Sequence, residues 1–166
     1  SLRPDYVEAY NNLGIAYKNF GKIDDAIASF EKAVVLMPNF VEAHCNLGLI
    51  YKELGKLDHA IKSFELALSI NPNYIEANNN VGILKKELGD IHDAINYFQK
   101  ILLIDFNNHD AHNNLGSCYH QLGNLTDAAL SFNNAIRIKS DFAEAHFNLG
   151  INYKELGQLH HAKSCY

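Results

Sequence analysis

The sequence predicts an all-α fold, a solenoid of helical hairpins, and the spacing of small and aromatic residues carries this prediction. All ten glycines fall into two series that advance by 34 residues. An alanine column and an aromatic column keep the same step. A fixed period of this length is the signature of a repeat array. The columns are Gly14, Gly48, Gly82, Gly116 and Gly150; Gly21, Gly55, Gly89, Gly123 and Gly157; Ala26, Ala60, Ala94, Ala128 and Ala162; and Phe30, Phe64, Phe98, Phe132 and Tyr166.

The period sets the domain organisation. We expect a single array over residues 1–166, with repeats 7–40, 41–74, 75–108, 109–142 and a partial repeat 143–166. Position 1 of each repeat is then Val7, Val41, Ile75, His109 or Ala143. Residues 1–4 look like the tail of a preceding repeat, so we expect a fragment of a longer array. A solenoid end without a polar cap leaves an apolar surface, and we therefore expect end-to-end contacts between molecules.

Each repeat is predicted to form two helices. The first covers about fourteen positions and is expected to be N-capped by Asp5, Asn39, Asn73 or Asp141. The second glycine series separates the helices, because glycine readily adopts the left-handed conformation after a helix end. The first glycine series lies inside the first helix, where glycine costs about 1 kcal/mol relative to alanine, so we expect close helix packing there. Positions 3, 7, 10, 11 and 14 form the apolar arc and are expected to be buried.

Composition and charge narrow the class of protein. The chain has 166 residues, 48% of them hydrophobic and 20% charged, which indicates a globular protein and not a disordered one. A net charge of −5 argues against nucleic acid as a partner. No apolar run is long enough for a membrane span. Three cysteines without a C-x-x-C pair (Cys45, Cys118 and Cys165) indicate reduced thiols. We therefore expect an intracellular protein, cytoplasmic or nuclear.

The first repeat also carries a recognisable motif. Residues 12–17 read Asn-Leu-Gly-Ile-Ala-Tyr and are followed by Gly21, Ala26, Phe30, Ala33 and Pro38. This pattern, with its equivalents in the later repeats, resembles the tetratricopeptide repeat over essentially the whole chain. Lys85, Ile101, Phe106 and Ser140 depart from it. The resemblance implies a right-handed superhelical solenoid whose first helices line a concave groove that binds extended polypeptide.

An asparagine at position 6 of every repeat is the leading candidate for ligand binding. Asparagine is a weak helix former, so its recurrence inside five helices runs against local propensity. Its amide offers both a donor and an acceptor, as a peptide group requires. Helices packed 8–10 Å apart would place one amide at about every third residue of an extended chain. The alternative is that these amides bond within the array and set its pitch. The column is Asn12, Asn46, Asn80, Asn114 and Asn148.

Other residues on the same helical face are further candidates for peptide binding. They lie at position 5 (Asn11, Asn79 and Asn113) and position 12 (Lys18, Lys52, Lys86 and Lys154). The charged columns can equally be solvated walls that stabilise the helices. Position 2 is acidic in every repeat, so the lysine-based clamp of tetratricopeptide domains that hold acidic chaperone tails is absent.

Neither catalytic nor metal chemistry is predicted for this chain. His109 and His112 are three residues apart and His160 and His161 are adjacent, but a zinc site needs three or four converging ligands. His44, His112 and His146 occupy position 4, where a packing role is expected. The sequence has no phosphate loop, metalloprotease motif or nucleophile elbow. We expect no cofactor and no enzymatic activity in this chain itself.

A closer resemblance concerns the parent protein. Residues 46–48 (Asn-Leu-Gly), 51–53 (Tyr-Lys-Glu) and 55–57 (Gly-Lys-Leu), with an asparagine in each first helix, resemble the repeats of nucleocytoplasmic O-linked N-acetylglucosamine transferases and SPINDLY-type O-fucosyltransferases. This resemblance implies that the asparagine column holds protein substrates for a C-terminal glycosyltransferase domain. The alternative is a non-catalytic scaffold that assembles a multiprotein complex.

Overall fold

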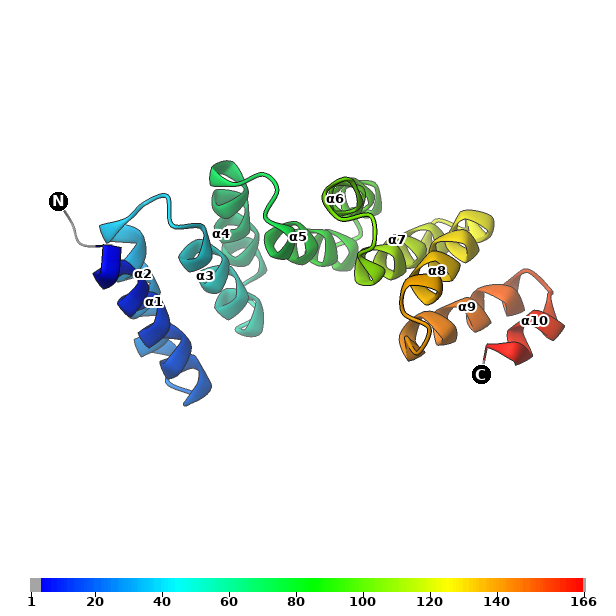
Figure 1. The fold of residues 1–166 in the computed structure, drawn as a ribbon, viewed down its shortest axis with the longest axis horizontal. Helices are drawn as coiled ribbons and strands as arrows, with labels where there is room; N and C mark the ends of the chain where they lie inside the picture. The colour runs from blue at the N-terminus through cyan, green and yellow to red at the C-terminus, as the bar shows by residue number, and fades with distance from the viewer. Residues whose placement is uncertain (1–3, 166) are drawn as a thin grey trace. The chain divides into compact units, whose positions relative to one another are not determined.

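The computed structural model describes residues 4–165, which form ten helices and no strand (Figure 1). This confirms the predicted all-α hairpin fold. The helices are α1 (Pro4–Asn19), α2 (Ile23–Leu36), α3 (Val41–Glu53), α4 (Leu57–Ile70), α5 (Ile75–Glu87), α6 (Ile91–Ile104), α7 (His109–Gln121), α8 (Leu125–Ile138), α9 (Ala143–Glu155) and α10 (Leu159–Ser164). The chain divides between Ala77 and Asn78, inside α5, into two compact units, and each is described by itself.

In the unit that precedes Asn78, the core lies between successive hairpins. Helix α1 packs on α2, α2 on α3, and α3 on α4. Ala26 and Phe30 of α2 meet Leu47 and Ile50 of α3, and all four are buried. Apolar residues at helical spacing therefore form one continuous stripe against the next hairpin, as the sequence period requires.

The unit that begins at Asn78 repeats this arrangement. Helix α6 packs on α7, α7 on α8, α8 on α9, and α9 on α10. Ala128 and Phe132 of α8 meet Leu149 of α9, and Tyr119 and Tyr153 cover the edge of this cluster. The equivalent column residues thus meet at each junction, which explains why they recur every 34 residues.

The glycines inside the first helices are explained by the phenylalanine column. A Cβ atom on Gly48 would lie 2.6 Å from Cε1 of Phe64, and a Cβ on Gly116 would lie 2.7 Å from the ring of Phe132. Gly14 and Gly82 face Phe30 and Phe98 in the same way. The four rings are at most 1% exposed. The predicted close approach is confirmed, and the ring of the second helix occupies the space that a side chain would need.

The second glycine series forms the turns within the hairpins, as predicted. Gly21, Gly55, Gly89, Gly123 and Gly157 all have φ between 69° and 88°. The prediction that position 14 is buried is wrong, because this residue immediately precedes the turn glycine and projects from the end of the helix. Its exposure is 81% for Phe20, 44% for Leu54, 50% for Leu88 and 43% for Leu122.

The predicted N-caps need a second correction. The N-cap residues of α3 and α9 are Phe40 and Phe142, one residue after Asn39 and Asp141, and neither has a side-chain cap. Helix α5 begins two residues after Asn73, and the side chain of Asp5 lies outside the described part. In α7 a side-chain cap does form, because Asn108 occupies the position of Phe40 and its Oδ1 accepts from the amide of Ala111 at 2.9 Å.

Three position-4 histidines hold the turns between repeats. Nε2 of His44, His112 and His146 lies 2.8, 3.0 and 2.9 Å from the carbonyl oxygens of Pro38, Phe106 and Ser140. A carbonyl oxygen only accepts, so each Nε2 carries the hydrogen. These rings therefore fasten the start of a first helix to the turn before it, which is the packing role expected from the sequence.

The buried ring of His112 makes stability depend on pH. It is 4% exposed, and burial lowers its pKa, against the opposing effect of its bond to Phe106. The unfolded chain therefore binds the proton more readily than the folded one. Stability from this group is complete above the ordinary pKa of about 6.5 and is lost as pH falls below it. The variant His112→Asn carries the residue found as Asn78 at this position of the preceding repeat. Between pH 7.5 and 5.5, urea denaturation should show that its free energy of unfolding falls by less than that of the wild type. An equal fall in both proteins would contradict this prediction.

Candidate functional site

The asparagines of the first helices bond to one another across adjacent repeats. Nδ2 of the position-6 residue donates to Oδ1 of the position-5 residue one repeat earlier. The distances are 2.9 Å from Asn46 to Asn11, 3.3 Å from Asn114 to Asn79 and 3.0 Å from Asn148 to Asn113. Each of the three position-5 asparagines thus accepts one such bond. These contacts join α1 to α3 in the first unit, and α5 to α7 and α7 to α9 in the second. In each unit, we call the surface formed by the first helices the first-helix face.

Four of the five position-6 asparagines remain at least partly exposed, including the three that donate these bonds. Asn12 is exposed, and Asn46, Asn114 and Asn148 are half-buried. Asn80 is buried more deeply, at 7% exposure. An amide has two N–H groups and an oxygen with two lone pairs, so one bond between helices does not exhaust it. Bonding within the array and bonding to a ligand are therefore compatible roles.

Asn113 is the most buried of the position-5 residues. It is 3% exposed, accepts from Asn148 and donates through Nδ2 to Oε1 of Glu144 at 2.9 Å. Removing it would leave the amide of Asn148 without this acceptor in a half-buried place. We expect Asn113→Ala to lower the free energy of unfolding by about 1–3 kcal/mol. The exposed Asn12→Ala should change the free energy of unfolding by less than about 0.5 kcal/mol. Equal changes for the two variants in urea denaturation would show that the buried hydrogen bonds of Asn113 do not stabilise the fold.

The position-12 lysines lie on the same face, and two of them bond within it. Nζ of Lys18 lies 2.7 Å from Oε1 of Glu53, one repeat further along. Nζ of Lys86 donates to Oγ of Ser117 at 3.3 Å, again in the next repeat. Lys52 is half-buried and Lys154 is exposed. In Lys18 and Lys86 the charge therefore contributes to contacts between repeats.

His120 replaces lysine at position 12 of the fourth repeat. Its Nε2 lies 3.3 Å from Oε2 of Glu155, the equivalent of the Lys18–Glu53 pair. The N–H is poorly aligned with that oxygen, so the contact is electrostatic and not a well-formed hydrogen bond. An acidic partner at this distance still favours the hydrogen on Nε2 and leaves Nδ1 as the acceptor of the ring.

The buried thiols lack the environment of a nucleophile. Burial, together with Glu76 and Glu42, raises the pKa of Cys45 to about 12. Burial raises the pKa of Cys118 to about 11, against the opposing charge of Lys86. A reactive cysteine needs a lowered pKa, because the thiolate is the reactive form. These two side chains are therefore small packing residues.

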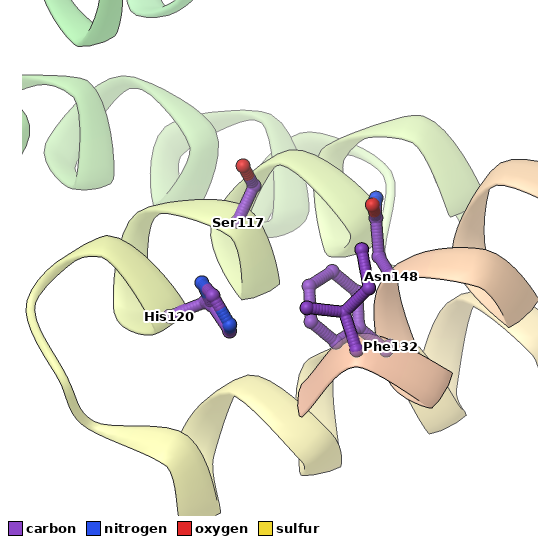
Figure 2. A pocket seen from close by; sticks show the side chains of 5 residues that line it. Ser117, His120, Phe132 and Asn148 are labelled. Atoms are coloured by element: carbon purple, nitrogen blue, oxygen red, sulfur yellow. The ribbon is translucent and has the colours of Figure 1, made fainter. Parts of the chain in front are cut away.

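A cavity of about 210 Å³ opens on the first-helix face between α7 and α9. Ser117 and His120 of α7, Phe132 of α8, and Asn148 and Ile151 of α9 line it. Figure 2 shows the side chains of His120, Phe132 and Asn148 around this space. The cavity was not predicted from the sequence, although one signal was available. Position 9 holds Ile15, Leu49, Ile83 and Ile151 in the other repeats but the smaller, polar Ser117 here.

A second hollow, of about 630 Å³, lies beside α9 and the end of α10. Asp141, His146, Phe147 and Cys165 are among its lining residues. Phe147 is 56% exposed, whereas Asn113, its equivalent one repeat earlier, is 3% exposed against the following helix.

Over the part of the chain that the structure describes, no group of three or more histidine, cysteine, aspartate or glutamate side chains is arranged to hold a metal ion. No helix among residues 4–165 has the length and apolar character needed to cross a bilayer.

Solved structures with the same fold include several proteins of similar size. A crystal structure of MamA protein is 24% identical and has a TM-score of 0.86, covering 98% of this chain and 89% of its own. PilW, described as a widely conserved type IV pilus biogenesis factor, is 28% identical with a TM-score of 0.84, over 96% of this chain and 74% of its own. YrrB, described as a TPR protein with an unusual peptide-binding site, is 22% identical with a TM-score of 0.78. The match covers 94% of this chain and 80% of YrrB. No curated protein sequence matches the chain.

Three family models of the same repeat type match the chain. Two models described as tetratricopeptide repeat match residues 41–74 and 75–108. A third, described as TPR repeat, matches residues 20–55 and 117–157. These matches cover well over half of the sequence, and the two single-repeat matches have the bounds predicted from the glycine spacing. The chain belongs to the tetratricopeptide repeat family.

Proposed function

We propose that this chain is a non-catalytic scaffold module that binds extended polypeptide along the first-helix face. The observation that carries the proposal is the row of position-6 amides, three of which are held in place by hydrogen bonds to the preceding repeat. An amide that is already positioned loses less conformational entropy when it binds, so it favours a ligand more than a mobile side chain does. Membership of a family known for protein interaction supports this role, as does the peptide-binding site described for YrrB.

The spacing of the first helices suits an extended ligand. Helices in contact lie about 8–10 Å apart, and an extended chain advances about 3.3 Å per residue. One position-6 amide would then meet a backbone group at about every third ligand residue. Such recognition reads the peptide backbone and tolerates many side-chain sequences, which suits a scaffold with several partners.

The experiment that tests this function uses a library of random twelve-residue peptides displayed on phage. Peptides selected by the wild-type chain are titrated against the variant in which Asn12, Asn46, Asn80, Asn114 and Asn148 are all alanine. We expect binding to weaken by at least about tenfold, because several backbone hydrogen bonds are lost together. Because that variant also loses bonds between helices, the exposed Asn12→Ala is tested alone and should weaken binding about two- to fivefold.

The matched control is Asn96→Ala, an exposed asparagine on α6, outside the first-helix face. It should leave peptide affinity unchanged. Selection of no peptide by the wild-type chain would overturn the proposal. So would full affinity in both the fivefold variant and Asn12→Ala.

A narrower role follows from the resemblance to O-linked sugar transferases. On that hypothesis the same face holds protein substrates for a glycosyltransferase domain elsewhere in the parent chain. Sequencing the parent transcript beyond the codon for Tyr166 tests it. A nucleotide-sugar-binding α/β domain would support the substrate-arm role, and its absence would leave the scaffold role alone.

End-to-end association remains a separate prediction. Phe147 is 56% exposed and lines a hollow together with Cys165, so it offers apolar surface for contact with another molecule. Sedimentation equilibrium should therefore show association that increases with concentration. A monomer at all concentrations up to the millimolar range would contradict it.

A further inference from the structure

The cavity between α7 and α9 sits among the amides proposed to bind polypeptide. Asn148, which lines it, belongs to the position-6 column and is held by Asn113. A ligand backbone bound at Asn148 would therefore pass over the opening. This places the cavity where a side chain of the ligand, and not only its backbone, can be read.

Ser117 is the lining residue that departs from its equivalents in the other repeats. Position 9 is isoleucine or leucine in the other repeats, and Ser117 removes most of that side chain. The remaining volume of about 210 Å³ exceeds the roughly 150 Å³ of a cavity known to hold a benzene ring in another protein. Phe132 and Ile151 supply apolar walls, so an aromatic ring fits in both size and polarity.

Two polar side chains, Ser117 and His120, line the cavity beside these apolar walls. Ser117 accepts a hydrogen bond from Lys86, so its own hydroxyl hydrogen remains available to donate. His120 faces Glu155 through Nε2, which leaves Nδ1 as an acceptor. One group that donates and one that accepts match a phenolic hydroxyl, which does both. An unsubstituted ring would leave these polar groups without partners on desolvation, and that carries a cost.

We propose that the cavity lined by Ser117, His120, Phe132, Asn148 and Ile151 is a specificity subsite that accepts a tyrosine side chain of the bound polypeptide. The proposal rests on the proposed function, because the tyrosine belongs to a ligand that lies along the first-helix face. It adds sequence selectivity to a surface that otherwise reads the peptide backbone. A scaffold with this subsite would prefer partners that carry a tyrosine in an extended segment.

The test measures the subsite without requiring a peptide. N-acetyl-tyrosinamide, N-acetyl-phenylalaninamide and N-acetyl-alaninamide are each titrated into the ¹⁵N-labelled chain, and the amide shifts of residues 116–120 and 148–151 are followed by NMR. We expect the tyrosine compound to bind about fivefold more tightly than the phenylalanine compound, with no saturable shift from the alanine compound. Equal binding of tyrosine and phenylalanine, or no binding of either, would overturn the proposal.

Ser117→Ile provides the decisive variant, because it inserts the residue that Ile83 and Ile151 supply at the same position. It fills the cavity while the helix keeps a side chain that this position accepts in adjacent repeats. Binding of the tyrosine compound should weaken by at least about tenfold. Leu49→Ile, at the equivalent position of the second repeat, is the matched control and should leave it unchanged. Unaltered binding in Ser117→Ile would overturn the assignment.

Failure of this proposal can be distinguished from failure of the proposed function. Peptides that bind through the asparagine column without any enrichment in tyrosine would refute the subsite and retain the function. Saturable binding of N-acetyl-tyrosinamide that Ser117→Ile abolishes, with no peptide selected from the library, would retain the cavity as a phenol site and refute polypeptide binding.

Discussion

Replacing Phe64 by alanine is expected to lower the free energy of unfolding by about 3–5 kcal/mol. The ring is fully buried and fills the space left by Gly48 on the facing helix. Alanine would remove its contacts and leave a cavity between α3 and α4 that a glycine on the facing helix cannot fill. Urea denaturation followed by circular dichroism at 222 nm measures the change.

Phe20→Ala is the matched control, because the same atoms are removed from a side chain that is 81% exposed. It should change the free energy of unfolding by less than about 0.5 kcal/mol. The comparison separates burial from any general effect of losing a phenylalanine. A loss below about 1 kcal/mol in Phe64→Ala would contradict the packing described here.

Gly48→Ala is expected to destabilise the protein by about 1–3 kcal/mol, although alanine is the better helix former by about 1 kcal/mol. The added methyl group would lie 2.6 Å from Cε1 of Phe64, closer than any normal carbon contact. The ring is surrounded by buried side chains and has little room to move. The overlap therefore outweighs the gain in helix propensity.

A double-mutant cycle identifies the cause of this effect. Phe64→Leu removes the part of the ring that faces Gly48, so adding Gly48→Ala to it should cost much less than adding it to the wild type. The expected coupling free energy is about 1–2 kcal/mol. Additive effects, or stabilisation by Gly48→Ala alone, would show that Gly48 is not retained for this contact.

The fold was predictable because the same packing contact recurs four times among the described residues. A glycine opposite a phenylalanine could be incidental once, but the pair Gly48 and Phe64 recurs as Gly116 and Phe132 at the same spacing. The turn glycines were equally clear, since a positive φ at Gly55 strongly favours this residue. Periodicity thus identified the hairpins and the residues at their junctions.

The predictions that were wrong concern helix ends, where the capping preference of a residue competes with the packing of its neighbours. Asn39 and Asp141 are typical N-cap residues, yet the helices begin one residue later at aromatic N-caps. Phe40 packs against the buried cluster of Val7, Ala33 and Ala43, and neither Phe40 nor Phe142 is exposed. Position 14 falls on the apolar side when the first helix is extended to it at about 100° per residue. Residues such as Leu54 lie just after the last helical residue, however, and are exposed.

The candidate site was predictable in its residues and not in its bonds. The asparagine column is visible in the sequence, but the direction of each amide depends on its rotamer and on the helix one repeat earlier. That is why the bonds from Asn46 to Asn11 and from Asn148 to Asn113 could be stated only as an alternative. The cavity was harder to predict than the asparagine bonds, because a cavity depends on the three-dimensional packing of several side chains around the small residue Ser117.

The central claim is that polypeptide binds along the first-helix face, and photo-crosslinking tests it most directly. The photoreactive residue p-benzoylphenylalanine is placed at Asn12 or Lys154 on this face, and at Lys62 or Lys100 on the second helices. A peptide selected from the random library is added, the mixture is irradiated, and adducts are measured by mass spectrometry. If polypeptide binds on the first-helix face, we expect adducts at Asn12 and Lys154, and only background levels of adduct at Lys62 and Lys100. Adducts confined to Lys62 or Lys100 would contradict it and would place binding on the second helices.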